Sequence, residues 1–164
     1  LKQSIVRMLA RLEPKKIIVV SSAPQIRYPD CYGIDMSKLG DFIAFRAAIE
    51  LVKDKRKDNC LQELYDKCKE LQRTGLLHTE NVVQQLYKMF STEEISDKIA
   101  ELITPKGLKI PVQVILQTIE SLHRACPTNT GDWYFTGNYP TPGGNKVVNK
   151  AFINYMEGRN VRGY

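Results

Sequence analysis

Several polar side chains gather around one loop, and their positions suggest a binding wall rather than a catalytic centre. Ser21 and Ser22 follow the apolar run 16–20, and Tyr32 and Asp35 stand near the end of the loop. The chain shows no candidate pair of nucleophile and base. The run 16–20 is short, continuous and β-branched, which predicts a buried parallel strand. Ligands of open α/β sheets lie beyond the carboxyl ends of such strands, so these four residues are candidates for the wall of a binding site.

The loop is shaped by its own residues. Pro24 and Pro29 fix φ and favour extended conformations in the residues before them, and Gly33 permits a tight turn. A purely structural interpretation stays open, in which Asp35 caps the next helix and Tyr32 packs.

Two segments that are far apart in the sequence carry a resemblance to a known family. The residues SSAPQIRYPDCYGIDM at 21–36 resemble the segment after the ribose-phosphate motif of glutamine phosphoribosylpyrophosphate amidotransferases, also called amidophosphoribosyltransferases. The residues YFTGNYP at 134–140 resemble an element near the carboxyl end of that family, and the two segments occur in the same order. The resemblance is clear over 1–53 and 91–140.

The catalytic motifs of the family are missing from this chain. Its amidotransferase half begins with a cysteine nucleophile, and its transferase half carries the run Asp-Asp-Ser-Ile-Val-Arg-Gly-Thr-Thr. The residues Ser4–Arg7 repeat only the middle of that run, without the acids before it or the glycine after it. Apolar residues there fall at helical spacing, which predicts a helix instead. We therefore expect a carboxyl-terminal piece of a larger enzyme, inactive by itself.

The resemblance implies an activity for the intact enzyme. Such an enzyme hydrolyses glutamine and passes the ammonia to C1 of magnesium-bound phosphoribosyl pyrophosphate, which gives 5-phosphoribosylamine in de novo purine synthesis. It also implies a cytoplasmic homo-oligomer with purine nucleotides as feedback inhibitors. Within this chain it implies no catalytic residue and no metal ligand, and it makes Ser21, Ser22, Tyr32 and Asp35 part of the wall of a nucleotide site.

One branch of the family carries an iron–sulfur cluster, and the resemblance predicts that this chain lacks it. The ligand positions fall on Asp30, Gly131 and Tyr134, and Cys31 stands one residue too late. Such clusters are usually held by four cysteine thiolates. The remaining cysteines and the two histidines show no metal-ligand spacing, which predicts reduced thiols and isolated histidines. These residues are Cys60, Cys68, Cys126, His78 and His123.

Composition excludes several other classes of protein. The chain has 164 residues, 43% of them hydrophobic and 26% charged, which is typical of a globular protein. No apolar run approaches the roughly 20 residues that span a bilayer, so we expect no membrane partner. The net charge of +6 is dispersed, with basic residues at 53–57 interspersed with Asp54 and Asp58, so we also expect no nucleic-acid partner.

The expected fold is a mostly helical α/β fragment. Residues 1–53 would form the last helix-strand unit of a type I phosphoribosyltransferase-like sheet, with helices over 2–12 and 39–53 around the strand at 16–21. Residues 54–90 would form an inserted helical hairpin, and 91–164 a carboxyl-terminal region of helices and loops. A non-enzymatic interaction module that uses this hairpin is the alternative function.

Finer predictions concern the second half of the chain. In the hairpin, Gly75 ends one helix and Thr79 caps the next. The run Ser91–Glu94 fits a capping box, and Pro111 suits the first turn of a helix that carries Val112, Ile115, Ile119 and Leu122. We expect a loop over 128–146 and a last helix from Val147 to Met156. The hairpin should be an addition to the core, so that removing 59–90 leaves a folded protein.

Overall fold

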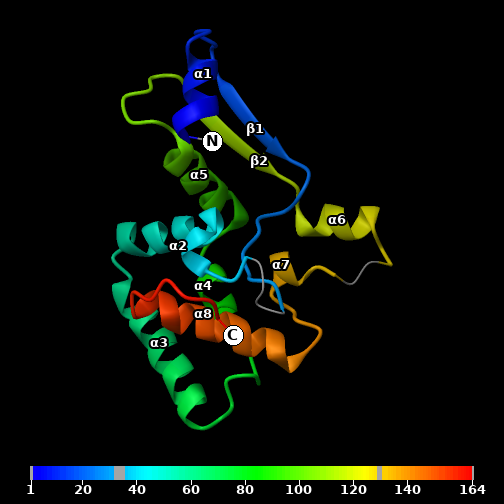
Figure 1. Ribbon diagram of the computed structural model, residues 1–164. Coiled ribbons are helices and arrows are strands. Elements are labelled where there is room, and N and C mark those ends of the chain that lie inside the picture. The colour runs from blue at the N-terminus through cyan, green and yellow to red at the C-terminus, as the bar shows by residue number, and fades with distance from the viewer. Residues whose placement is uncertain (1, 32–35, 129–130, 164) are drawn as a thin grey trace.

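The computed structural model describes residues 2–31, 36–128 and 131–163. A small sheet with its helices lies at one end, and a larger helical part lies at the other (Figure 1). The sheet has two parallel strands, β1 (Ile17–Ser21) and β2 (Val112–Leu116), in a register that pairs the first residues of both strands and the last residues of both strands. The expected fold class, mostly helical α/β with a small parallel sheet, is thereby confirmed.

The position of β2 corrects one prediction. Val112 and Ile115 were expected on a helix, because their spacing together with Ile119 and Leu122 suits a helical face. In the structure they belong to a strand, and the helix α6 (Ile119–Ala125) begins only after Thr118, whose hydroxyl accepts a hydrogen bond from the backbone N–H of Ser121 at 3.1 Å. Val112, Val114 and Ile115 are β-branched, so the segment suits a strand as well as a helix. Its pairing with β1 selects the strand.

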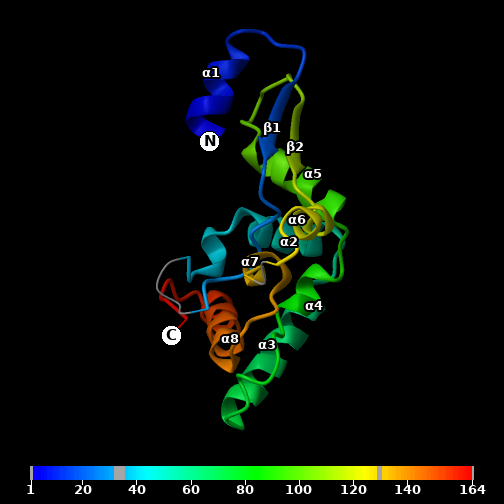
Figure 2. The ribbon, with the colours of Figure 1, turned by 90° about the vertical axis from the view of Figure 1, so that its right-hand side faces the viewer.

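Two helices flank the sheet. The amino-terminal helix begins with wide π-type turns over Lys2–Val6 and continues as α1 (Arg7–Ala10). The residues Ser4–Arg7, which repeat the middle of the transferase motif, are therefore helical as predicted. The second helix, α5 (Thr92–Ile103), starts with the predicted capping box between Ser91 and Glu94. Figure 2 shows α1 and α5 on opposite sides of the two strands.

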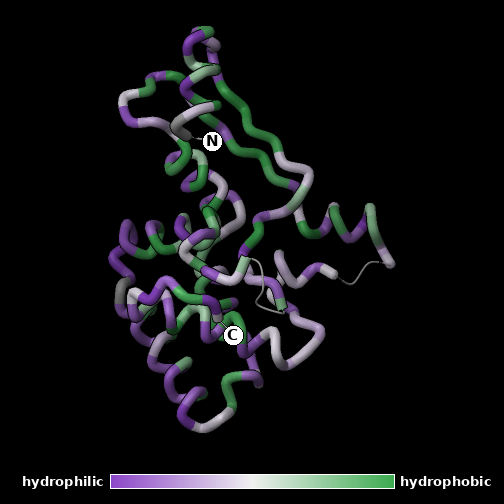
Figure 3. Tube along the Cα trace, viewed as in Figure 1, coloured by the Kyte–Doolittle hydropathy of each residue, from purple (hydrophilic) through white to green (hydrophobic). Residues whose placement is uncertain are grey.

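The two faces of the sheet are covered unequally. Ile17 is buried, and four further side chains of that face pack against the core, namely Val19, Val112, Val114 and Leu116. On the other face Ile18 and Val20 are 52% and 70% exposed, although the strands are among the most hydrophobic stretches of the chain (Figure 3). The apolar residues of the amino-terminal helix are exposed as well, among them Met8 and Leu12. The strand was expected to be buried on both faces, so this outer face differs from the prediction.

The main core lies between the other helices. The apolar residues at 43, 44, 47, 48, 51 and 52 predict one broad apolar face for the helix expected over 39–53. Helix α2 (Ile43–Asp54) follows a short 3-10 turn at Leu39–Asp41 and buries this face except for the partly exposed Ile43, together with Phe45 and Ile49. Helix α5 packs along α2. Helices α3 (Asp58–Arg73), α4 (Gln84–Tyr87) and α8 (Pro142–Met156) add side chains to the same hydrophobic cluster, in which the rings of Phe45 and Phe152 are 6.3 Å apart. The predicted helix end at Gly75 is confirmed by its φ of 75°.

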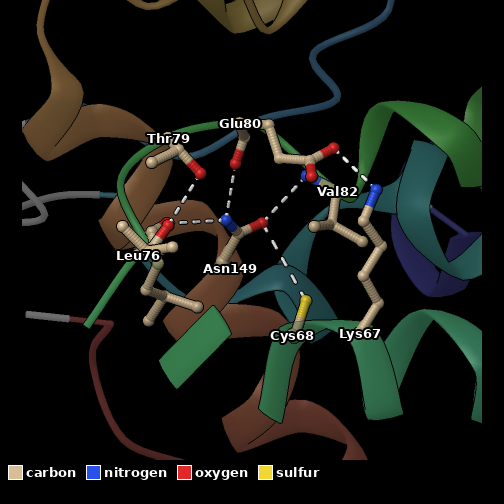
Figure 4. A network of polar contacts seen from close by, with 8 residues as sticks. Lys67, Cys68, Leu76, Thr79, Glu80, Val82 and Asn149 are labelled. Carbon is tan, nitrogen blue, oxygen red and sulfur yellow. Dashed lines mark hydrogen bonds and ion pairs between the residues drawn. The ribbon is translucent and has the colours of Figure 1, made fainter. Parts of the chain in front are cut away.

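Asn149 of α8 organises the segment between α3 and α4 (Figure 4). Its amide is fully buried and donates to the carbonyls of Leu77 and Glu80 at 2.9 and 2.7 Å, and its oxygen accepts from the N–H of Val82 at 3.0 Å and from the thiol of Cys68 at 4.0 Å. Buried backbone groups need such partners. The side-chain amide of Asn149 thus takes the place of helical hydrogen bonds in this stretch.

The same network corrects the prediction for Thr79. This residue was expected to cap a helix, but its hydroxyl donates to the carbonyl of Leu76 at 2.8 Å, and the helix begins only at Gln84. The spacing of Val83, Leu86, Tyr87 and Phe90 nevertheless predicts that these side chains face inwards, and all four are buried. They belong to the same hydrophobic cluster as α2 and α8, so the packing does not support a separable addition. The division into 1–53, 54–90 and 91–164 stays a prediction.

The predicted loop over 128–146 contains more structure than expected. A short helix, α7 (Trp133–Thr136), lies within it, and α8 begins at Pro142 instead of Val147. Gly143 and Gly144 are therefore helical, and Gly144 packs so closely on Tyr139 that an added Cβ would lie 2.3 Å from the ring. Within the described ranges, no helix has the length and apolar character needed to cross a membrane.

Candidate functional site

The two segments that carry the family resemblance lie against one another. The backbone carbonyl of Tyr134 accepts hydrogen bonds from the N–H groups of Arg27 and Tyr28 at 2.8 and 3.1 Å. The hydroxyl of Tyr139 donates to the carbonyl of Pro29 at 2.8 Å. The loop after β1 is thus fixed on α7 and on the turn that follows it, although the two stretches are separated in sequence by most of the helical core.

A further contact joins the two segments through side chains. The hydroxyl of Tyr134 donates to the Asp30 carboxylate at 3.1 Å, so the side chains of two of the predicted cluster-ligand positions meet. The neighbouring Cys31 is buried, and burial together with the Asp30 carboxylate raises the pKa of its thiol above the usual value. A neutral thiol is a poor nucleophile and a poor metal ligand, so this corner of the loop is suited to packing.

Buried tyrosines complete the contact. The rings of Tyr28 and Tyr87 meet edge to face at 5.2 Å, and the Tyr87 hydroxyl donates to the carbonyl of Arg27 at 2.9 Å. Burial raises the pKa values of Tyr28, Tyr87 and Tyr139 well above the ordinary value for a phenol. All three are therefore neutral at physiological pH, and the hydroxyls of Tyr87 and Tyr139 act as hydrogen-bond donors.

Gly137 is the point at which this contact is tightest, and we expect Gly137→Ala to lower the free energy of unfolding by about 2–4 kcal/mol. Its φ is 73°, and an added Cβ would lie 2.6 Å from Nδ2 of Asn81 and 2.8 Å from the ring of Tyr28. Gly75→Ala is the matched control, because Gly75 has a φ of 75° but nothing within 4 Å of an added Cβ. Gly75→Ala should lower the free energy of unfolding by only about 1 kcal/mol, the cost of placing alanine at a positive φ. Equal losses in urea unfolding of the two variants would contradict the close packing.

The predicted site residues are only partly brought into this arrangement. Ser21 is the last residue of β1, and its hydroxyl donates to the carbonyl of Ala23 at 3.1 Å and accepts from the N–H of Ala23 at 3.2 Å. Ser22 is exposed. Tyr32 and Asp35 lie outside the described residues, so their predicted role and the helix-capping alternative both stay predictions.

Sequence reasoning missed a cavity at the carboxyl ends of both strands. Its volume is about 230 Å³, and it is lined by the loop after β1, the first turn of α5 and the connection from β2 to α6. Gln25 and Arg27 contribute side chains from the loop. Neither residue type stands out in a loop sequence, and the partners that fix them come from 60 or more residues downstream. The strand-end rule for open α/β sheets could have indicated the place, but not the residues.

The cysteines and histidines do not form a common centre. Burial raises the pKa of the Cys68 thiol to about 12, while Cys126 is exposed at the end of α6. His123 was expected to be isolated, but its Nε2 lies 2.8 Å from an Asp132 carboxylate oxygen. Among the described residues no three cysteine, histidine or acidic side chains are placed to hold a metal ion.

Comparison with known proteins gives a partial similarity. The chain is 46% identical over 43 residues to the amidophosphoribosyltransferases of Pasteurella multocida and of Haemophilus influenzae. The matched stretch covers 26% of this chain and 8% of the length of each relative. No family model and no solved structure matches the chain.

Proposed function

We propose that this chain is the carboxyl-terminal piece of an amidophosphoribosyltransferase. The intact enzyme, a glycosyltransferase, transfers glutamine-derived ammonia to phosphoribosyl pyrophosphate and forms 5-phosphoribosylamine for purine synthesis in the cytoplasm. It is a homo-oligomer that purine nucleotides inhibit. This piece contributes a wall of the nucleotide site through Ser21, Ser22, Tyr32 and Asp35, and it has no catalytic residue of its own.

The contact between the two resembling segments carries the proposal. Two motifs that match one family in sequence order have no local reason to meet in space, yet Tyr134 accepts from Arg27 and Tyr28 through its backbone carbonyl. The partial similarity to two amidophosphoribosyltransferases is in agreement. Parts of one conserved architecture would be expected to pack together in this way.

The outer face of the sheet also supports a larger parent protein. Parallel sheets are normally covered on both faces, and small sheets need neighbours for stability. In the described chain β1 pairs only with β2, and Ile18 and Val20 of its outer face are exposed. Further strands and helices of a transferase domain would cover these side chains.

Under this proposal the intact enzyme binds magnesium but carries no iron–sulfur cluster. The described residues offer no group of ligands for a metal ion, so in the intact enzyme magnesium would be held by residues outside this part of the chain. Of the three positions where cluster ligands would stand, Asp30 and Tyr134 are joined by a hydrogen bond. We therefore propose an iron-free protein, and stoichiometric iron and sulfide after anaerobic purification would overturn this assignment.

Activity measurements test the proposal directly. The 164-residue chain, incubated with glutamine, phosphoribosyl pyrophosphate and magnesium, should give no phosphoribosylamine and no pyrophosphate above background. The product of the intact coding region should give both, and its sequence should contain the cysteine nucleophile and the acidic phosphate motif upstream. Activity of the chain alone would show that the active site has been misplaced, and an intact gene without these motifs would favour the interaction module.

A further inference from the structure

The cavity at the carboxyl ends of β1 and β2 is lined by an arginine, Arg27, that forms no ion pair with any described residue. Nε and Nη2 of Arg27 donate to the amide oxygen of Gln25 at 3.0 and 2.7 Å, and Nη2 donates to the hydroxyl of Thr92 at 3.3 Å. The guanidinium lies over the ring of Tyr87, 5.3 Å from its centroid. Within the described ranges Arg27 has no carboxylate partner, so all the groups that orient it are neutral.

Gln25 makes this arrangement rigid. Its side chain is 3% exposed, and its amide nitrogen donates to the carbonyl of Thr92 at 2.8 Å and to the hydroxyl of Ser96 at 2.9 Å. Gln25 thereby connects the loop after β1 to the first turn of α5 and holds the guanidinium between them. A guanidinium has five N–H donors, and the two on Nη1 are not used by these contacts. A cation held in one orientation by neutral groups can donate from Nη1 to a carboxylate oxygen, and its charge strengthens that hydrogen bond.

The rim of the cavity has the opposite charge. Glu93 and Glu120 both line it, and both are exposed residues that form no ion pair in the part of the chain that the structure describes. Pro24 and Ile119 add apolar surface between the two charged regions. The volume of about 230 Å³ is smaller than the roughly 300 Å³ at which ordinary ligand pockets begin, so the cavity suits a small metabolite.

We propose that this cavity binds a free α-amino acid. The carboxylate would bind to Arg27, the ammonium group would face Glu93 and Glu120, and the side chain would lie along Pro24 and Ile119. The charge pattern selects a zwitterion, because two rim carboxylates repel a phosphate dianion and Arg27 repels a simple amine. The site lies entirely on described residues of this chain and does not depend on the transferase assignment, so either proposal can fail while the other stands.

Titrations of the 164-residue chain test the site. We expect saturable changes in the NMR signals of the Gln25 side-chain amide and of the Arg27 Nε–H with L-alanine at millimolar concentration. Inorganic phosphate and methylammonium should each bind at least tenfold more weakly. Arg27→Met should weaken L-alanine binding at least tenfold, whereas Arg46→Met, which removes an exposed arginine of α2, should leave it unchanged.

A second variant keeps the test valid if Arg27→Met disturbs the fold. Glu93→Gln combined with Glu120→Gln removes only exposed rim charges, and it should weaken L-alanine binding while strengthening phosphate binding. The proposal would be overturned if the NMR signals showed no saturable change up to about 50 mM L-alanine, well above the millimolar affinity expected of a weak metabolite site. It would also be overturned if Arg27→Met bound L-alanine as tightly as the parent chain, or if the parent chain bound phosphate more tightly than L-alanine. A double variant with the same ratio of L-alanine to phosphate affinity as the parent chain would overturn it as well.

Discussion

Replacing Asn149 by leucine should lower the free energy of unfolding by roughly 3–9 kcal/mol. The side chain is fully buried, and its amide satisfies the carbonyls of Leu77 and Glu80 and the N–H of Val82. Leucine has a similar size but no polar atoms, so these three backbone groups would be buried without partners. Each such group costs about 1–3 kcal/mol, which gives roughly 3–9 kcal/mol for the three groups. That is a large part of the 5–15 kcal/mol that stabilises ordinary domains.

Urea unfolding followed by circular dichroism would measure this loss, and two further variants define its cause. Asn149→Asp keeps the shape and the acceptor but loses both donors and buries a charge, so it should be at least as damaging as leucine. Asn145→Ala is the matched control, because Asn145 lies one turn earlier on α8 and makes a single exposed contact, 3.2 Å to the carbonyl of His78. It should cost less than about 0.5 kcal/mol. A leucine variant within 1 kcal/mol of the parent protein would show that water satisfies these backbone groups.

The elements that the sequence predicts correctly are those whose signals are local. The capping box at Ser91 and Glu94 needs only residues three positions apart, and the helix end at Gly75 needs only one residue that tolerates a positive φ. The apolar face of α2 and the β-branched run of β1 are equally self-contained. Each of these segments would favour its observed conformation before the rest of the chain folds.

The elements that the sequence misses depend on distant partners. Val112 to Leu116 becomes a strand because it pairs with Ile17 to Ser21, far away in the chain. The helix expected after Thr79 is delayed to Gln84 because Asn149 of α8 binds the intervening backbone. No periodicity within either segment contains this information, and tertiary contacts override such patterns regularly.

The candidate site likewise combines features that local sequence predicts with features that depend on distant residues. The loop after β1 is predicted to be a shaped segment at the end of a strand, and it lies there. Its contact with Tyr134 and the orientation of Arg27 by Gln25, Thr92 and Tyr87 are not predictable, because each partner comes from a different element. Ser21 was selected for its hydroxyl, which instead bonds to the backbone of Ala23. Residue type alone therefore does not separate binding groups from those already used by the fold.

Replacing residues 59–90 by a short Gly/Ser linker should abolish cooperative unfolding, the opposite of what the sequence pattern suggests. Leu64, Cys68, Val82 and Leu86 are buried in one cluster with Phe45 and Phe152 of α2 and α8. Burial of one large apolar side chain contributes about 1.5–3 kcal/mol, so the loss of several exceeds the stability of an ordinary domain. The fluorescence of the single tryptophan and circular dichroism, followed during urea unfolding, would report the change.

Point substitutions separate this packing role from the effect of the deletion itself. Leu86 is completely buried, so Leu86→Ala should lower the free energy of unfolding by about 2–5 kcal/mol. Leu76 belongs to the same segment but is 47% exposed, so Leu76→Ala should change it by less than about 1 kcal/mol. If the linker variant instead unfolds cooperatively with the parent's midpoint, and Leu86→Ala behaves like Leu76→Ala, then the core of α2 and α8 is complete without this segment. In that case residues 59–90 would be the separable hairpin that the alternative interaction module requires.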